Sequence, residues 1–173
     1  MFLAKTWLEE ARLGSIRDSL QFSHYHDVSR ITCGGGLAIF WKNGFNLEVE
    51  SSSQNHIDVV INKGKDNAWR FTGIYEAPKT HLHSETWELI RGLHRRVSLP
   101  WLCGGDFNEI LKSHEKSGGR LRPYGQIEQF REVRTSVIYS ILASPEINSL
   151  GLELLWWYGL GEVRSGSKLG GMV

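Results

Sequence analysis

One stretch near the middle of the chain constrains the fold most. An apolar run, 101–103, lies between Pro100 and a pair of glycines and is too short for a helix, so it predicts a buried strand. Asp106 and Asn108 follow two residues apart, and such residues share a face on an extended backbone. Phe107 is expected to face the other way and to anchor the segment in the core. The sequence therefore predicts a carboxylate and a carboxamide side by side at the end of a core strand.

Two interpretations of this Asp-Asn pair remain open. A carboxylate can take a proton or orient a water, and a carboxamide can donate to an oxyanion, so the pair suits a phosphate site. Asp and Asn after glycine are also ordinary turn formers at the end of a strand. The local sequence does not choose between a catalytic pair and a turn.

Composition limits the class of protein. The chain has 173 residues, of which 40% are hydrophobic and 23% charged, which fits one globular domain with a real core. Twenty basic and nineteen acidic side chains give a net charge of +1, so any contact with DNA needs a local basic patch. Cys33 and Cys103 lack metal-ligand spacing and are expected to be free thiols.

Nothing in the sequence indicates export or membrane insertion. The N-terminus lacks the basic-then-apolar layout of a secretion signal, and no apolar run approaches the ~20 residues of a membrane span. We therefore expect an intracellular protein, nuclear or cytoplasmic, without a membrane partner and without an evident obligate protein partner.

Hydrophobic periodicity predicts three helices and a β-meander. The first helix is expected at 7–20, with Thr6 and Glu9 as a capping box, and the third after Pro123. An Asn43-Gly44 hairpin turn is expected within an antiparallel meander over about 25–75. The remaining expected elements are a helix at 85–97, strands near 22–29, 37–41, 45–49, 57–61 and 69–75, and a loop at 51–54.

Several polar residues on these strands could carry chemistry. His24 and His26 share a face and could chelate a metal, but no third ligand is nearby, which favours plain strand residues. His56 and Asp58 could orient one another in catalysis or simply form a polar strand face, and the second interpretation is preferred. Tyr75 stands where the last strand of the meander ends.

The segment from Pro100 to Arg120 resembles the Gly-Asp-Phe-Asn motif of the endonuclease/exonuclease/phosphatase superfamily. More narrowly, it resembles the endonuclease domain of LINE-type (non-LTR) retrotransposons. The resemblance covers about residues 2–130, and its motifs recur in order. They are GGGLA at 34–38, NHID at 55–58, WRFTGIY at 69–75, PWLCGGDFNEIL at 100–111, Glu115-Lys116 and Gly118-Gly119-Arg120.

The resemblance implies a fold and an activity. The fold would be α/β (α+β), a two-sheet sandwich flanked by helices. The activity would be Mg²⁺-dependent hydrolysis of phosphodiester bonds in DNA. Tyr75, Asp106 and Asn108 would be the catalytic residues, and Arg120 and Arg122 would contact DNA phosphates. The domain would span residues 1–145, with 146–173 as a divergent, flexible tail.

The chain departs from this pattern at the metal site. The resemblance places a metal-binding glutamate in a Glu-Thr dipeptide where this chain has Lys5-Thr6, and an ammonium cannot ligate Mg²⁺. The first strand and the C-terminal Asp-His motif of the superfamily are also expected to be missing. We therefore expect a degenerate domain that has lost catalysis and does not bind Mg²⁺. A related hypothesis pairs Lys5 with Asp106.

Two alternatives remain open at this stage. The first is an active, metal-dependent endonuclease that uses Glu9, Glu109 or His56 as substitute ligands. The second is a non-catalytic module that binds nucleic acid or protein.

Overall fold

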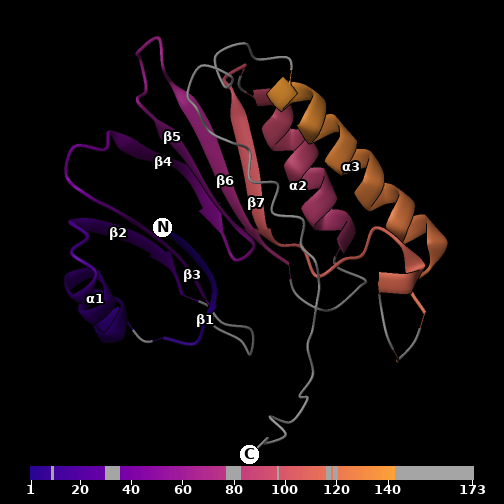
Figure 1. Cartoon of the computed structure of the whole chain (residues 1–173), viewed down its shortest axis with the longest axis horizontal. Helices are drawn as coiled ribbons and strands as arrows, with labels where there is room; N and C mark the ends of the chain where they lie inside the picture. The colour runs from indigo at the N-terminus through magenta and orange to yellow at the C-terminus, as the bar shows by residue number, and fades with distance from the viewer. Residues whose placement is uncertain are drawn as a thin grey trace, which may run out of the picture.

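The protein is described by a computed structural model that covers residues 1–8, 10–29, 36–76, 83–96, 98–115, 118 and 121–142, with the backbone only at 10, 83, 134 and 136–142. Within these residues the chain forms two sheets that pack face to face, with helices on both outer sides (Figure 1). The predicted two-sheet sandwich flanked by helices is confirmed. Residues 146–173, expected as a tail, lie outside the described part. The strands and main helices are β1 (Phe2–Thr6), α1 (Glu10–Ser19), β2 (His24–Val28), β3 (Gly36–Trp41), β4 (Leu47–Ser53), β5 (His56–Ile61), β6 (Trp69–Tyr75), α2 (His83–Arg96), β7 (Trp101–Asp106) and α3 (Tyr124–Leu142).

The first sheet has the order β1-β3-β2, and both pairings are antiparallel. Its central strand β3 is buried because α1 covers one face and the second sheet covers the other. Leu13 of α1 packs there against Ala38 and Phe40.

The start of α1 differs from the prediction. Thr6 is the last residue of β1, and the helix begins only at Glu10. Thr6 therefore does not serve as the helix N-cap, and Glu9, the other half of the expected capping box, lies outside the described residues. Trp7 lies between the two elements with 65% of its surface exposed.

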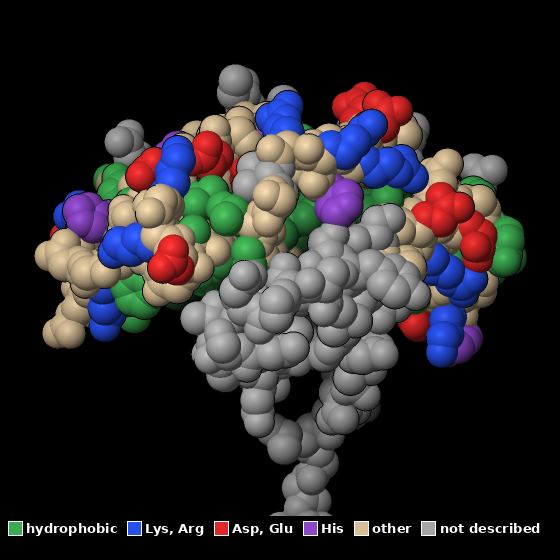
Figure 2. All heavy atoms as spheres, turned by 90° about the horizontal axis from the view of Figure 1, so that it is seen from above, with side chains coloured by type: hydrophobic (Ala, Val, Ile, Leu, Met, Phe, Trp, Pro, Cys, Tyr) green, Lys and Arg blue, Asp and Glu red, His purple; other side chains and the backbone are tan. Residues whose placement is uncertain are grey.

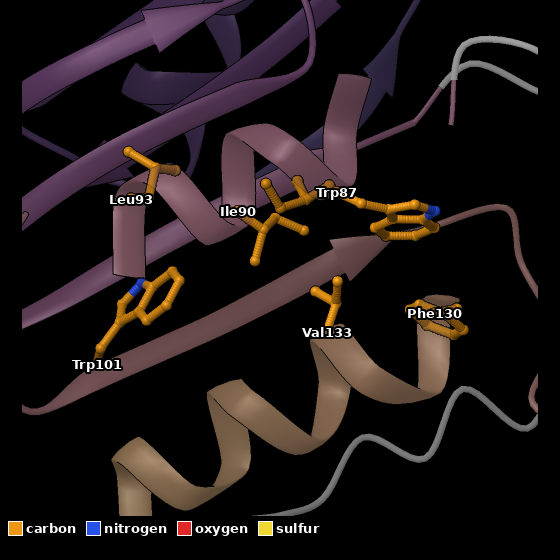
Figure 3. Close-up of a cluster of buried hydrophobic side chains, with 7 residues drawn as sticks. Trp87, Ile90, Leu93, Trp101, Phe130 and Val133 are labelled. Atoms are coloured by element: carbon orange, nitrogen blue, oxygen red, sulfur yellow. The ribbon is translucent and has the colours of Figure 1, made fainter. Parts of the chain in front are cut away.

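The second sheet has the order β4-β5-β6-β7. Its first three strands form an antiparallel meander, and β7 runs parallel to β6 because α2 carries the chain back across the sheet. Figure 3 shows side chains of α2, β7 and α3 meeting in one cluster on the outer face of the second sheet, which points away from the first sheet. The buried members of the cluster are Ile74, Trp87, Ile90, Leu93, Trp101, Phe130 and Val133.

The two sheets meet through alternate residues of their strands. Ile57, Val59 and Ile61 of β5 face the first sheet, as their period of two predicts. Phe2 of β1 packs edge-on against Phe71 of β6, with ring centroids 5.8 Å apart. No described strand pairs with the outer edge of β1 or of β7.

The predicted turn at Asn43-Gly44 exists but does not join two strands of one sheet. Gly44 has φ +93°, which glycine adopts at little cost. The strand before the turn, β3, belongs to the first sheet, and the strand after it, β4, belongs to the second. The single meander expected over 25–75 is therefore wrong: the turn passes the chain between sheets. The loop expected at 51–54 is also wrong, because β4 continues to Ser53.

A buried polar network joins strands β5, β6 and β7, and its Arg70 also binds the end of α2. Arg70 forms an ion pair with Asp58, and Thr72 donates its hydroxyl to Asp58 Oδ1 at 2.6 Å. Trp101 Nε1 donates to the Thr72 hydroxyl at 2.8 Å, and the Arg70 guanidinium lies 5.2 Å from the centre of the Trp101 ring. Each member of the network is thus satisfied from within the protein, as burial of polar groups requires.

Among the described helices, none is both long and apolar enough to cross a membrane.

Candidate functional site at the ends of β6 and β7

Tyr75 and Asp106 are opposite one another at the carboxyl ends of two parallel strands. The ladder continues one step further, because the Glu76 N–H donates to the Asp106 carbonyl at 2.9 Å. Tyr75 is 1% exposed and packs between the two sheets, so it is not the solvent-facing tyrosine that a surface role would need. Asp106 is exposed at the same end. Two of the predicted site residues are therefore brought together.

Gly105 positions Asp106 through a close backbone approach. Its φ is +147°, and a Cβ at this position would lie 1.9 Å from the Ile74 carbonyl oxygen. Any side chain would push β7 away from β6. The neighbouring Gly104 has no such constraint, because its nearest atom, in Phe71, is 4.0 Å from the corresponding Cβ position. Of the two glycines, Gly105 alone makes a close backbone approach, and it is to the neighbouring strand.

Asn108 joins the site in a way that the extended-strand prediction does not describe. Its φ is +46°, so the chain turns into a left-handed conformation there, and the expectation that Asp106 and Asn108 share one strand face is wrong. The Asn108 N–H donates to Asp106 Oδ1 at 3.0 Å, and Asn108 Nδ2 donates to the Glu76 carbonyl. The Asp-Asn pair thus forms a turn that is tied to the end of β6. Phe107 anchors this turn, because its ring lies 5.5 Å from that of Phe130.

Arg122, predicted to contact DNA phosphate, is instead bound to the site loop. Its Nη2 donates to the Asn108 carbonyl at 2.8 Å, and its Nε lies 3.1 Å from Glu109 Oε1. The Glu109 side chain is 0% exposed and that of Arg122 is 17% exposed. The guanidinium therefore holds the loop after β7 in place. Arg120, the second nominated residue, lies outside the described residues.

Lys5 is exposed at the end of β1, where a β-bulge interrupts the pairing between Ala4 and Thr6. Its φ of +58° is uncommon for a residue other than glycine. Among the ion pairs between described residues, none joins Lys5 to Asp106. The hypothesis of a Lys5–Asp106 pair is therefore wrong for this conformation.

The described residues do not fit a resident Mg²⁺ ion. Mg²⁺ needs several hard oxygen ligands, with at least one or two carboxylates. Asp106 has one oxygen engaged with the Asn108 N–H, and Asn108 turns its amide nitrogen toward Glu76. Within the described ranges, no three His, Cys, Asp or Glu side chains gather as a metal site. The donor set is therefore too small for the ion that the resemblance implies.

The two histidines of β2 have separate partners. His24 Nε2 lies 3.0 Å from Asn43 Oδ1, and its ring stacks on Trp41 with centroids 5.4 Å apart. His26 Nε2 lies 3.2 Å from the Ser52 hydroxyl. The preferred interpretation, in which these are strand residues and not a chelating pair, agrees with these contacts.

Two of the three substitute ligands considered for an active enzyme already bind other side chains. Glu109 is paired with Arg122. His56 is 4% exposed and has a serine hydroxyl at each ring nitrogen, from Ser51 at 3.0 Å and Ser53 at 2.7 Å. Burial lowers the pKa of His56, so a neutral ring is favoured. Glu9 lies outside the described residues.

Sequence reasoning did not identify two main-chain groups that shape the site. The Asn55 carbonyl accepts from the Tyr75 N–H at 2.9 Å, and the Glu76 carbonyl accepts from Asn108. Asn55 directly precedes β5, and Glu76 directly follows β6. The predicted ends of these strands therefore indicate both residues. Their hydrogen-bond partners depend on which strands are neighbours, and the sequence alone does not give that.

The visible surface carries both signs of charge. Figure 2 shows Lys and Arg side chains interspersed with Asp and Glu over the described part of this face. The site itself presents the exposed carboxylate of Asp106 beside the buried Tyr75, an arrangement that can accept a proton or orient a water. No protein-family model matches the chain, and no curated protein matches it either.

Proposed function

We propose that the chain is a degenerate Mg²⁺-dependent phosphodiesterase domain, derived from the DNA endonuclease of a LINE-type retrotransposon, and that its catalysis is lost. The observation that carries the proposal is the pairing of Tyr75 with Asp106 at the ends of two parallel strands, with Asn108 tied beside them. These are the three residues to which the resemblance assigns catalysis. They come from two strands about thirty positions apart, and the fold brings them to one place.

The residues at this place retain part of the ancestral chemistry. In the ancestral enzyme, Mg²⁺ would supply charge neutralisation at the phosphate. Asp106 can orient a water or take its proton, because its carboxylate is exposed and held by the Asn108 N–H. Tyr75 is fixed by packing between the sheets and by the hydrogen bond from its N–H to Asn55. Of these two residues, Asp106 alone presents its side chain to solvent.

The loss of catalysis follows from the charge at Lys5. The resemblance assigns the chief metal ligand to this position, where a glutamate would supply two oxygens and a negative charge. A lysine supplies neither, and in the place of that glutamate its positive charge, about 4 Å from a divalent ion, would cost several kcal/mol at an effective dielectric constant of about 20. Asp106 alone cannot offset both the missing ligand and the repulsion.

The active-enzyme alternative is disfavoured by the contacts of its substitute ligands. Glu109 would have to leave Arg122, and His56 would have to leave two serines and the interior of the protein. Breaking a buried ion pair by removing one partner costs about 3–5 kcal/mol, so recruitment of Glu109 carries a large penalty.

The binding-module alternative is also disfavoured. Non-specific binding to DNA depends on lysine and arginine side chains that neutralise phosphates. The net charge is only +1, and Arg122 is already engaged with Glu109 and Asn108.

A plasmid-nicking assay tests the proposal. Supercoiled plasmid is incubated with the wild type, with Lys5→Glu and with Asp106→Ala, each with Mg²⁺ and with Mn²⁺. We expect no nicking above background from the wild type or from Asp106→Ala. Wild-type nicking that disappears in Asp106→Ala would overturn the loss of catalysis.

Two comparisons separate ancestry from present activity. A gain of nicking in Lys5→Glu that is abolished by adding Asp106→Ala would support both the ancestral site and the reason for its loss. A salt-dependent shift of a DNA fragment that is lost in Arg120→Ala and Arg122→Ala, without nicking, would favour the binding module instead. Circular dichroism of each variant controls for folding.

A further inference from the structure

The turn between β4 and β5 is attached to both sheets. On the side of the first sheet, Gln54 Nε2 donates to the Ser29 carbonyl at 3.2 Å, and Ser52 bonds His26 at 3.2 Å. On the side of the second sheet, the Asn55 carbonyl accepts the Tyr75 N–H at 2.9 Å. This turn therefore connects the two layers and also fixes the end of β6.

His56 holds the turn from the interior. It opposes Ser53 across the β4–β5 ladder, and a bulge in β4 between Val49 and Ser51 shifts the register there. The shift brings Ser51 and Ser53 onto the face of β4 that His56 shares. The His56 ring thus hydrogen-bonds two serine hydroxyls at the end of β4. Only 4% of the surface of His56 is exposed to solvent.

We propose that His56, Ser51 and Ser53 form an acid-sensitive clasp that keeps the β4–β5 turn closed and that releases the end of β6 when the imidazole is protonated. This inference concerns a conformational device and does not depend on the ancestry or activity proposed above. Its consequence is local: opening the turn removes the Asn55 carbonyl from the Tyr75 N–H.

Burial of the ring explains why protonation opens the clasp. A neutral imidazole has one donor and one acceptor nitrogen, so one serine accepts from the ring and the other donates to it. In the protonated ring both nitrogens are donors, and the serine that donated must rotate its hydroxyl hydrogen away and accept instead. The closed turn then encloses a positive charge in a residue that is 4% exposed, and opening returns that charge to water.

The charged groups around His56 shift its pKa in both directions. Burial lowers the pKa of His56 most, Asp58 on the same strand raises it, and Arg70 on β6 and Arg96 on α2 lower it. The strand on the other side, β4, contributes the two serines. An open turn exposes the ring to water, where its pKa returns toward the ordinary value of 6.5. The open form therefore binds more protons, so acidification below that value favours opening, and the clasp is at full strength above it.

Hydrogen exchange at the Tyr75 amide, followed by NMR, measures the opening directly. After correction for the intrinsic exchange rate, we expect protection of this amide to fall between about pH 7.5 and pH 5.5, by up to about tenfold, because opening gains at most tenfold per pH unit below the ordinary pKa. The amide of Val59, which opposes Phe71 in a hydrogen-bonded pair of β5 and β6, should keep its protection over the same range.

Variants identify the group responsible. In His56→Gln, the pH dependence at Tyr75 should disappear. His24→Gln is the matched control, because His24 bonds Asn43 and does not contact the turn, and it should keep the wild-type pH dependence. An equal pH dependence in His56→Gln and the wild type would overturn the proposal.

A second measurement needs no variant. The imidazole of His56 can be titrated by NMR in the wild-type protein. Under the clasp model, His56 titrates below the ordinary value of 6.5, and protection at Tyr75 falls over the pH range between 6.5 and the midpoint of that titration. A His56 titration that leaves Tyr75 protected would overturn the proposal, whatever the nicking assay shows.

Discussion

Arg70 and Asp58 form a two-pronged ion pair inside the protein. Arg70 Nε lies 2.7 Å from Asp58 Oδ1 and Nη2 lies 2.7 Å from Oδ2, and both side chains are 2% exposed. Arg70 Nη1 donates to the Leu93 carbonyl at 2.6 Å. That carbonyl is among the last four of α2, which have no partner within the helix. One guanidinium therefore joins two strands to the end of the helix that covers them.

Replacing Arg70 with methionine should destabilise the fold strongly. The variant keeps most of the side-chain volume but leaves Asp58 as a buried charge without its partner, which costs about 3–5 kcal/mol. Urea unfolding followed by circular dichroism measures the change. Lys63→Met is the control, because Lys63 forms exposed pairs with Glu48 and Glu50, and it should behave like the wild type. Equal stability of the two variants would contradict the role given to the buried pair.

A Gly105→Ala substitution should be far more damaging than Gly104→Ala. A methyl group at position 105 would lie 1.9 Å from the Ile74 carbonyl, on a backbone with φ +147°. We expect a loss of more than about 3 kcal/mol, or failure to fold, because overlap adds to backbone strain. At position 104 the nearest atom is 4.0 Å away. Thermal melts of the two variants give the comparison, and similar melting temperatures would show that β7 can move away from β6 at little cost.

Trp87 of the outer cluster should contribute far more to stability than the exposed Trp7. Trp87 is 1% exposed, and its ring stacks on Phe130 with centroids 5.0 Å apart. Truncation to alanine should cost about 3–5 kcal/mol. Trp7, 65% exposed, is the matched control, and Trp7→Ala should change stability little. Urea midpoints of both variants test this prediction, which fails if Trp7→Ala is the more damaging change.

The Cys103 thiol should be unreactive in the folded protein. Burial raises the pKa of Cys103 to about 12, because the thiolate would lie in the apolar cluster against which this side chain packs. In a Cys33→Ser background, which removes the cysteine outside the described residues, a disulfide reagent at mild alkaline pH should label Cys103 slowly. Labelling should become fast in urea. Rapid labelling of the folded protein would show an ionised, accessible thiol instead.

Strands with a clear period could be predicted well from sequence. The alternation of Ile57, Val59 and Ile61 located β5 and its buried face, and β6 matches the predicted 69–75. Periodicity is a local property that burial on one face imposes directly. It does not tell which sheet a strand joins, so the Asn43-Gly44 turn was assigned to a hairpin when it connects the two sheets.

The candidate site shows a similar division. Residue types and order predicted Tyr75 and Asp106 at strand ends, and the structure places them opposite one another. The left-handed backbone at Asn108 and the pairing of Arg122 with Glu109 were missed. Both depend on contacts with chain segments distant in sequence, which neither propensity nor spacing reports.

Binding of Mn²⁺, followed by the paramagnetic resonance signal of the free ion, tests the central claim most directly. Mn²⁺ prefers the same oxygen ligands as Mg²⁺. With wild-type protein and Asp106→Ala titrated in parallel, we predict the same weak, non-stoichiometric binding for both at millimolar metal. One tightly bound ion per wild-type chain, absent in Asp106→Ala, would contradict the claim that this site has lost its metal.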